Sequence, residues 1–177
     1  MVHEVYQERD GSLAVRVPES VNKSFGNPVS FDGTLRAPGS YAWKLAAAMP
    51  EVSKIQTSIS FEKGTRACGL LLHASDDGEA SYYIRLEFLS NRLVFDRWPR
   101  PGDQPFMVEL ERPADLAQAG VVEMAVLVDR TIGVVYLNNR VAMSVRMYNL
   151  KGGSWGVFVN QGTCHFRSAS ASLHLLS

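Results

Sequence analysis

Residues 82–88 read Tyr82-Tyr83-Ile84-Arg85-Leu86-Glu87-Phe88, and residues 93–98 read Leu93-Val94-Phe95-Asp96-Arg97-Trp98. Successive side chains of a β-strand point to opposite faces, so each segment can present one apolar face and one polar face. The short spacing between them predicts a β-hairpin. With a two-residue turn at Ser90-Asn91, the expected register pairs Phe88 with Leu93 and Leu86 with Phe95 on the apolar face.

The polar face of this hairpin carries the candidate ligand-binding residues. The same register sets Arg85 opposite Asp96 and Tyr83 opposite Trp98, with Glu87 on the same face. An aromatic ring packs against the C–H face of a sugar, while arginine and carboxylate groups exchange charge-assisted hydrogen bonds with hydroxyls. These residues therefore predict a sugar-binding surface. A solvated strand face with one cross-strand ion pair is the alternative interpretation.

Other candidates on and near this surface are weaker. Trp155 and Tyr148 are second-rank ligand-binding candidates, because Trp155 also suits a core position and Tyr148 falls at a strand end. Glu87 and Asp96 form a pair of carboxylates of the kind that glycoside hydrolysis uses. Arg85 would keep Asp96 ionised, which suits binding and works against a general acid that needs a raised pKa. We therefore expect binding without catalysis.

Alternation of apolar and polar residues continues along most of the chain, between clusters of Gly, Pro, Asn and Asp. Further strands are expected at residues 29–31, 41–45, 55–61, 67–73, 121–129, 132–138, 141–148, 155–160, 164–167 and 171–176. Gln161-Gly162 is expected to separate two of these strands, and only residues 114–120 could form a turn or two of helix. Many short strands predict an all-β fold, an antiparallel two-sheet β-sandwich of concanavalin-like or jelly-roll type.

The alternation also predicts which side chains form the core and how the chain divides. The expected core contains Ile84, Leu86, Phe88, Leu93, Phe95, Val126, Val128 and Val135. Residues 1–21 are polar, with a turn at Asp10-Gly11, and are expected to be a connector that adds nothing to the core. Residues 22–177 are expected to form the β-sandwich domain.

Charge and composition narrow the classes of partner. The chain has 177 residues, with 18 Lys and Arg against 18 Asp and Glu. Because no basic stripe or tail is present, neither nucleic acid nor an anionic membrane is expected as a partner. The polar N-terminus does not resemble a signal peptide. The localisation stays open: extracellular for part of a secreted polysaccharide-degrading enzyme, cytoplasmic otherwise.

Neither a cofactor nor a metal is expected from the motifs. The four histidines lack metal-binding spacing, and no phosphate loop or hydrolytic nucleophile motif occurs. Cys68 and Cys164 are expected to be small buried residues, and the sequence leaves open whether they pair. Asp76, Asp77 and Glu79, in the run Asp76-Asp77-Gly78-Glu79, could offer oxygen ligands to calcium, but the same run is typical of an ordinary turn.

Three stretches resemble the C-terminal β-sandwich of glycoside hydrolase family 32 enzymes. Residues 125–138, read around Asp129-Arg130, resemble the Val-Asp-Arg-Ser-x-x-Glu-Val-Phe-x-Asn hairpin of that domain. Residues 155–159, Trp-Gly-Val-Phe-Val, resemble a later strand of it. His3-Glu4-Val5, followed by Asp10-Gly11-Ser12-Leu13 and Val17-Pro18, resembles the connector between the catalytic propeller and the sandwich.

The resemblance implies an accessory domain. Family 32 enzymes are invertases, levanases and inulinases, whose catalytic carboxylates lie in the propeller within Asn-Asp-Pro, Arg-Asp-Pro and Glu-Cys motifs. None of these motifs occurs in this chain. A related free-standing sandwich, carbohydrate-binding module family 66, binds the terminal fructose of levan. The implied partners are a β-fructan or related glycan and the catalytic propeller of a parent enzyme.

One departure from the family pattern leaves two roles open. The glutamate of the family hairpin is replaced by Val134 here, while Asp129 and Arg130 are kept and could simply cap the turn. The chain could be a sugar-binding module, or a structural accessory domain with no ligand of its own. The structural role predicts an exposed apolar patch where a propeller would pack. Its candidate residues, which could equally face the other sheet, are Ala125, Leu127, Ile132, Val134 and Tyr136.

Overall fold

The computed structural model describes residues 3–99, 110–116 and 119–175. The N-terminal part contains β1 (Glu4–Gln7), β2 (Leu13–Arg16), the short helix α1 (Glu19–Lys23) and β3 (Phe25–Ala48). The middle part contains β4 (Val52–Phe61), β5 (Ala67–Ala74), β6 (Ser81–Glu87), β7 (Arg92–Trp98) and β8 (Leu110–Pro113). The last part contains β9 (Val122–Asp129), β10 (Ile132–Leu137), β11 (Val141–Arg146) and β12 (Ser154–His174).

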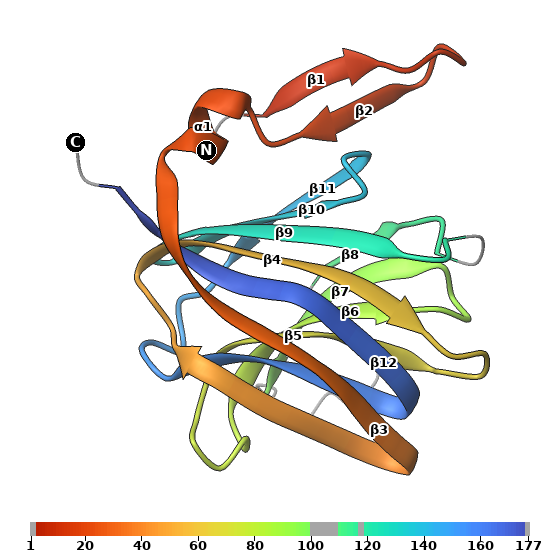
Figure 1. Ribbon diagram of the computed structural model, residues 1–177, viewed down its shortest axis with the longest axis vertical. Helices are drawn as coiled ribbons and strands as arrows, with labels where there is room; N and C mark the ends of the chain where they lie inside the picture. The colour runs from red at the N-terminus through yellow and green to blue at the C-terminus, as the bar shows by residue number, and fades with distance from the viewer. Residues whose placement is uncertain (1–2, 100–109, 117–118, 176–177) are drawn as a thin grey trace.

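The two long strands β3 and β12 connect the two layers of a sandwich (Figure 1). The first half of β12 pairs with β5, and that layer continues through β6, β7 and β8. The second half of β12 pairs with β4, and the other layer continues through β9, β10 and β11. The pairings between these strands are antiparallel. The predicted antiparallel two-sheet sandwich is therefore confirmed.

The core lies between the two layers. All eight predicted core residues are buried in one cluster, with exposed fractions of 9% or less. Burying an aliphatic or aromatic side chain of this size contributes about 1.5–3 kcal/mol before conformational entropy is counted. No helix in the described part of the chain is both long and apolar enough to cross a membrane.

Several predicted boundaries were wrong. The expected break at Gln161-Gly162 is a bulge inside β12, where Gln161 and Gly162 have φ angles of 56° and 121° and the strand then continues. The described residues of the segment 114–120 are not helical, and residues 117 and 118 lie outside the described part. Residue 176, at the end of the predicted strand 171–176, lies outside it as well.

The predicted register of the central hairpin was also wrong, by two residues. Leu86 pairs with Leu93 and Ile84 with Phe95, so the turn takes residues 88–91 and not Ser90-Asn91 alone. Asn91 adopts a φ angle of 48°, a conformation that asparagine tolerates in turns. A shift by two residues keeps every side chain on its predicted face.

The N-terminal segment contributes to a second, smaller core, contrary to the expectation of a bare connector. β1 and β2 form a hairpin, and Val17, which follows it, packs with Leu127, Val134 and Tyr136. His3 Nδ1 lies 3.0 Å from the Tyr136 hydroxyl, and further along the hairpin Arg140 pairs with the carboxylate of Glu8.

This packing covers the face that was a candidate exposed patch. Leu127, Val134 and Tyr136 are 3% exposed or less. Val134 therefore has an apolar neighbour in Val17. The expected patch is not exposed, because the chain's own N-terminal segment lies over it.

Candidate ligand-binding groove

The strands β6 and β7 bring five of the predicted site residues to one face of the sheet. Tyr83, Arg85 and Glu87 alternate along β6, and Asp96 and Trp98 alternate along β7. Because the register differs from the predicted one, Arg85 lies opposite Val94 and Tyr83 lies opposite Asp96. Arg85 and Asp96 therefore meet diagonally, and their groups lie 3.8 Å apart between Nη2 and Oδ2.

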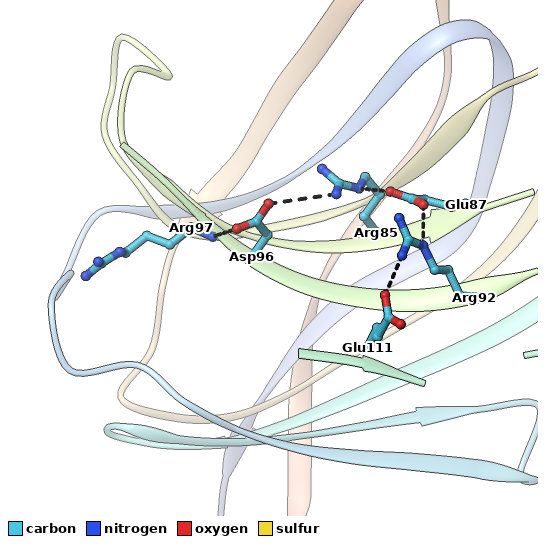
Figure 2. A network of polar contacts seen from close by, with 6 residues as sticks. All are labelled: Arg85, Glu87, Arg92, Asp96, Arg97 and Glu111. Carbon is cyan, nitrogen blue, oxygen red and sulfur yellow. Dashed lines mark hydrogen bonds and ion pairs between the residues drawn. The ribbon is translucent and has the colours of Figure 1, made fainter. Parts of the chain in front are cut away.

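A chain of ion pairs holds the charged side chains among them in place, as Figure 2 shows. Arg85 Nε lies 2.9 Å from Glu87 Oε1, and Arg92 Nε donates to Glu87 Oε2 over 2.6 Å. Arg92 also donates to Glu111 on β8. These hydrogen bonds raise the pKa of the Arg92 guanidinium, and the bond to Glu87 makes the largest contribution. Glu87 thus holds two arginines, which fixes the orientation of Arg85 along the sheet.

Asp96 is the most buried of the ion-paired side chains in this network. Its side chain is only 4% exposed, and its Oδ1 accepts a hydrogen bond of 2.9 Å from the backbone N–H of Arg97. The Arg85 side chain beside it is 19% exposed. A carboxylate and a guanidinium held at the base of a surface hollow can accept from and donate to the hydroxyls of one ligand.

The hollow above this pair is the candidate ligand-binding groove. Aromatic side chains from two distant parts of the chain line it. It has a volume of about 330 Å³, and its aromatic lining consists of Tyr41, Trp43, Tyr83 and Trp98. The Tyr41 hydroxyl donates to the Tyr83 hydroxyl over 3.3 Å, and both rings pack on Phe158 beneath them. Burial, with this hydrogen bond, raises the pKa of Tyr41. Flat apolar rings beside an ion pair match the two kinds of surface that a sugar presents.

The loop between β5 and β6 closes one side of the hollow. Asp77 Oδ1 accepts from the Ser75 hydroxyl over 2.6 Å and from the backbone N–H of Glu79 over 3.0 Å. These hydrogen bonds lower the pKa of Asp77. The carboxylate therefore closes an Asx-type turn. Within the described residues, no group of three or more His, Cys, Asp or Glu side chains is placed to hold a metal ion.

The remaining predicted residues lie elsewhere. Glu87 lines a neighbouring hollow and reaches the first one through its contact with Arg85. Trp155 is fully buried in the core, and Tyr148 is 63% exposed on a loop outside the lining of the hollow. The turn at Asp129-Arg130 carries an ion pair of 3.2 Å between these two neighbours.

Sequence reasoning missed the contribution of β3. Tyr41 and Trp43 alternate on one face of this strand, and they reach the groove because β3 pairs with β12. Their alternation is visible in the sequence, but the pairing joins segments more than 110 residues apart. Arg97 and Glu79 also line the hollow, and neither was predicted as a sugar-binding residue.

Comparison with known proteins shows what this fold is similar to. The family model described as glycosyl hydrolases family 32 C terminal matches residues 42–173. The solved structure of carbohydrate-binding module CBM66 from Bacillus subtilis aligns with a TM-score of 0.69 and 14% identity, over 84% of this chain and 95% of that chain. No curated protein matches the chain by sequence.

Whole enzymes contain a domain of the same fold. Exo-inulinase from Aspergillus awamori aligns with a TM-score of 0.67 and 16% identity, over 99% of this chain and 34% of that enzyme. Fructan 1-exohydrolase IIa from Cichorium intybus aligns with a TM-score of 0.68 and 16% identity, over 99% of this chain and 40% of that enzyme. The chain therefore spans well under half of either enzyme. At these identities the likeness establishes the fold alone.

Proposed function

This chain belongs to the family of C-terminal domains of glycosyl hydrolases family 32, and we propose that it is a non-catalytic module that binds carbohydrate in the groove of β6 and β7. The proposed ligand is the terminal sugar of a β-fructan or of a related glycan. The observation that carries the proposal is the position of Arg85 and the buried Asp96 at the base of an aromatic-lined hollow. A solvated strand face would not need to bury Asp96.

Each part of the groove has a role in this proposal. Tyr83 and Trp98 form the stacking wall, joined by Tyr41 and Trp43 from β3. Arg85 donates to ring hydroxyls, and Asp96 accepts from them. A rigid, prearranged site of this kind loses little conformational entropy when a ligand binds.

We propose further that the domain hydrolyses nothing. The three catalytic motifs of the family's propeller do not occur in the sequence. Both carboxylate oxygens of Glu87 already contact guanidinium groups, Oε1 that of Arg85 and Oε2 that of Arg92, so neither oxygen is placed to act on a glycosidic bond. Release of reducing sugar from sucrose, levan or inulin by the purified domain would contradict this part of the proposal.

Calorimetric titration with fructose, sucrose, levan and inulin tests the binding proposal. Losing a charge-assisted hydrogen bond costs about 1–3 kcal/mol, and losing the packing area of an aromatic ring costs a comparable amount, so Arg85→Ala and Trp98→Ala should each weaken binding by roughly 5- to 150-fold. The exposed Lys151, which lines neither hollow, provides the control variant Lys151→Ala. Unchanged affinity in both site variants, with the fold intact, would refute the assignment of the groove.

A structural accessory role is the second candidate. Val5 and Leu13 on the N-terminal hairpin are 59% and 72% exposed. These side chains would suit a neighbouring domain, such as the catalytic propeller that residues 1–21 would join to a sandwich of residues 22–177. The two roles are compatible, and binding of sugar by the isolated chain separates a module from a purely structural domain.

A further inference from the structure

A second hollow adjoins the groove at its other end and has a volume of about 380 Å³. Arg85 lines both hollows and forms the boundary between them. Arg66, Glu87, Arg92 and Asn160 complete most of the polar lining of the second one. No aromatic ring is among its lining residues in the described part of the chain.

The order of residues along β6 places the two hollows in line. Tyr83, Arg85 and Glu87 follow one another at two-residue steps, each of roughly 6–7 Å. Tyr83 lines only the first hollow, Arg85 lines both, and Glu87 lines only the second. A ligand that extends from the first hollow along the strand therefore passes over Arg85 and reaches Glu87.

The floor of the second hollow is a row of residues in register across four strands. Asn160 of β12 pairs with Ala67 of β5, Ala67 pairs with Glu87, and Glu87 pairs with Arg92. Neighbouring strands lie about 4.8 Å apart. Because the small side chain of Ala67 sits between Asn160 and Glu87, the row is hollowed at that point.

Two side chains in this hollow have unused hydrogen-bonding capacity. The side chains of Arg66 and Asn160 make no hydrogen bond or ion pair with any described residue. The backbone of Arg66 is nevertheless fixed, since its N–H donates to the Gln161 carbonyl over 2.8 Å and its carbonyl accepts from Phe88 over 3.2 Å. In contrast, the network of Glu87 and Arg92 is already paired.

We propose that this second hollow is a subsite that binds the next hydroxylated unit of a glycan chain whose end occupies the first hollow. The inference rests on the proposed function and adds to it that the module distinguishes a chain from a single sugar. Arg66 and Asn160 hydrogen-bond the hydroxyls of the second unit. The subsite has no stacking ring, so it adds less to affinity than the aromatic hollow does.

Titration calorimetry with fructose and with β-(2→6)-linked fructobiose tests this subsite. The disaccharide should bind the wild-type chain roughly 3- to 30-fold more tightly than fructose. Arg66→Ala and Asn160→Ala should each weaken binding of the disaccharide by roughly 3- to 10-fold and leave binding of fructose unchanged. Arg36→Ala removes an exposed arginine of β3 outside both hollows and should change neither affinity.

The outcomes separate the two proposals. If fructose binds but the disaccharide binds no more tightly, or if Arg66→Ala weakens both ligands equally, the subsite is refuted and the groove stands. If neither ligand binds, the proposed function fails for fructans and the subsite fails with it. Thermal unfolding of each variant shows that a loss of affinity does not come from a loss of fold.

Discussion

The indole ring of Trp43 lies directly over Gly78. A Cβ atom at Gly78 would lie 2.6 Å from both Cε2 and Cζ2 of that ring, closer than such atoms approach in proteins. Gly78 also has a φ angle of +73°, and its backbone N–H donates to the Ser75 carbonyl over 2.9 Å. The loop between β5 and β6 thus sets the position of one aromatic wall of the groove, across a contact between strands distant in sequence.

We expect Gly78→Ala to displace Trp43 and to weaken binding of sugar. The matched control is Gly64→Ala, because Gly64 has a similar φ angle of +89° and no atom lies within 4 Å of its Cβ position. Each substitution should cost about 1–2 kcal/mol of stability through left-handed backbone strain. Only Gly78→Ala should also reduce affinity in calorimetry. Equal affinities in the two variants would show that Trp43 does not contact the ligand.

The second prediction compares Arg85→Lys with Arg85→Ala. Alanine removes the positive charge that offsets the cost of burying the Asp96 carboxylate. This loss should lower the free energy of unfolding by about 1–3 kcal/mol. Lysine restores a positive charge but not the planar fork that reaches Glu87 and Asp96 together. In chemical denaturation, lysine should recover part of the stability, while its affinity for sugar should stay close to that of alanine. Full recovery of affinity by lysine would mean that only the charge matters.

Much of the fold and part of the groove could be predicted because strand alternation depends on local sequence alone. Tyr83, Arg85 and Asp96 were correctly predicted to share one face although the predicted register was wrong. A slip of two residues leaves each side chain on the same face. The partners across the hairpin were wrong because nothing in residues 88–91 distinguishes a two-residue turn from a longer one.

Features that depend on long-range packing could not be predicted. Tyr41 and Trp43 reach the groove only through the pairing of β3 with β12, and Val17 reaches Val134 only through the return of the N-terminal segment. Residues 1–21 were predicted to be a connector because polar residues flank the few apolar residues in this segment. Within them, however, Ala14 and Val17 are 1% and 7% exposed, and Val17 packs with Leu127, Val134 and Tyr136 of the sandwich.

The third prediction tests that contact through Val17. Truncation to alanine removes two buried carbon atoms beside Leu127 and Val134, and should lower the free energy of unfolding by about 1–2 kcal/mol. Val29→Ala is the control. Val29 on β3 is 52% exposed, so its truncation should lower the free energy of unfolding far less. Urea denaturation of both variants measures the difference. Equal stability would mean that the N-terminal segment is not packed on β9 and β10.

The fourth prediction concerns the two cysteines, which are both free and fully buried. Burial, with a contact to Cys164, raises the pKa of the Cys68 thiol well above its ordinary value, so the reactive thiolate is scarce. We expect neither thiol to react with an aromatic disulfide reagent such as dithiobis-nitrobenzoate at pH 8 until the chain unfolds. Both should then react together, at a rate that follows unfolding. Rapid labelling of the folded chain would contradict their burial.

The last prediction is a dependence of binding on acid pH through Asp77. Hydrogen bonds from Ser75 and from the backbone of Glu79 lower the pKa of this carboxyl below its ordinary value of 3.8. A lowered pKa in the folded state means that the turn is fully stabilised above pH 3.8, and that this contribution is lost as the pH falls through the lower, folded-state value. Because the turn positions Gly78 under Trp43, affinity for sugar should stay constant down to about pH 4 and fall below it. Asp77→Asn, whose amide still accepts these hydrogen bonds but does not titrate there, should bind somewhat more weakly at pH 7 and should lose less of its affinity below pH 4. Calorimetry of both proteins between pH 3 and pH 7 makes the comparison, and parallel pH profiles would show that Asp77 does not govern the groove.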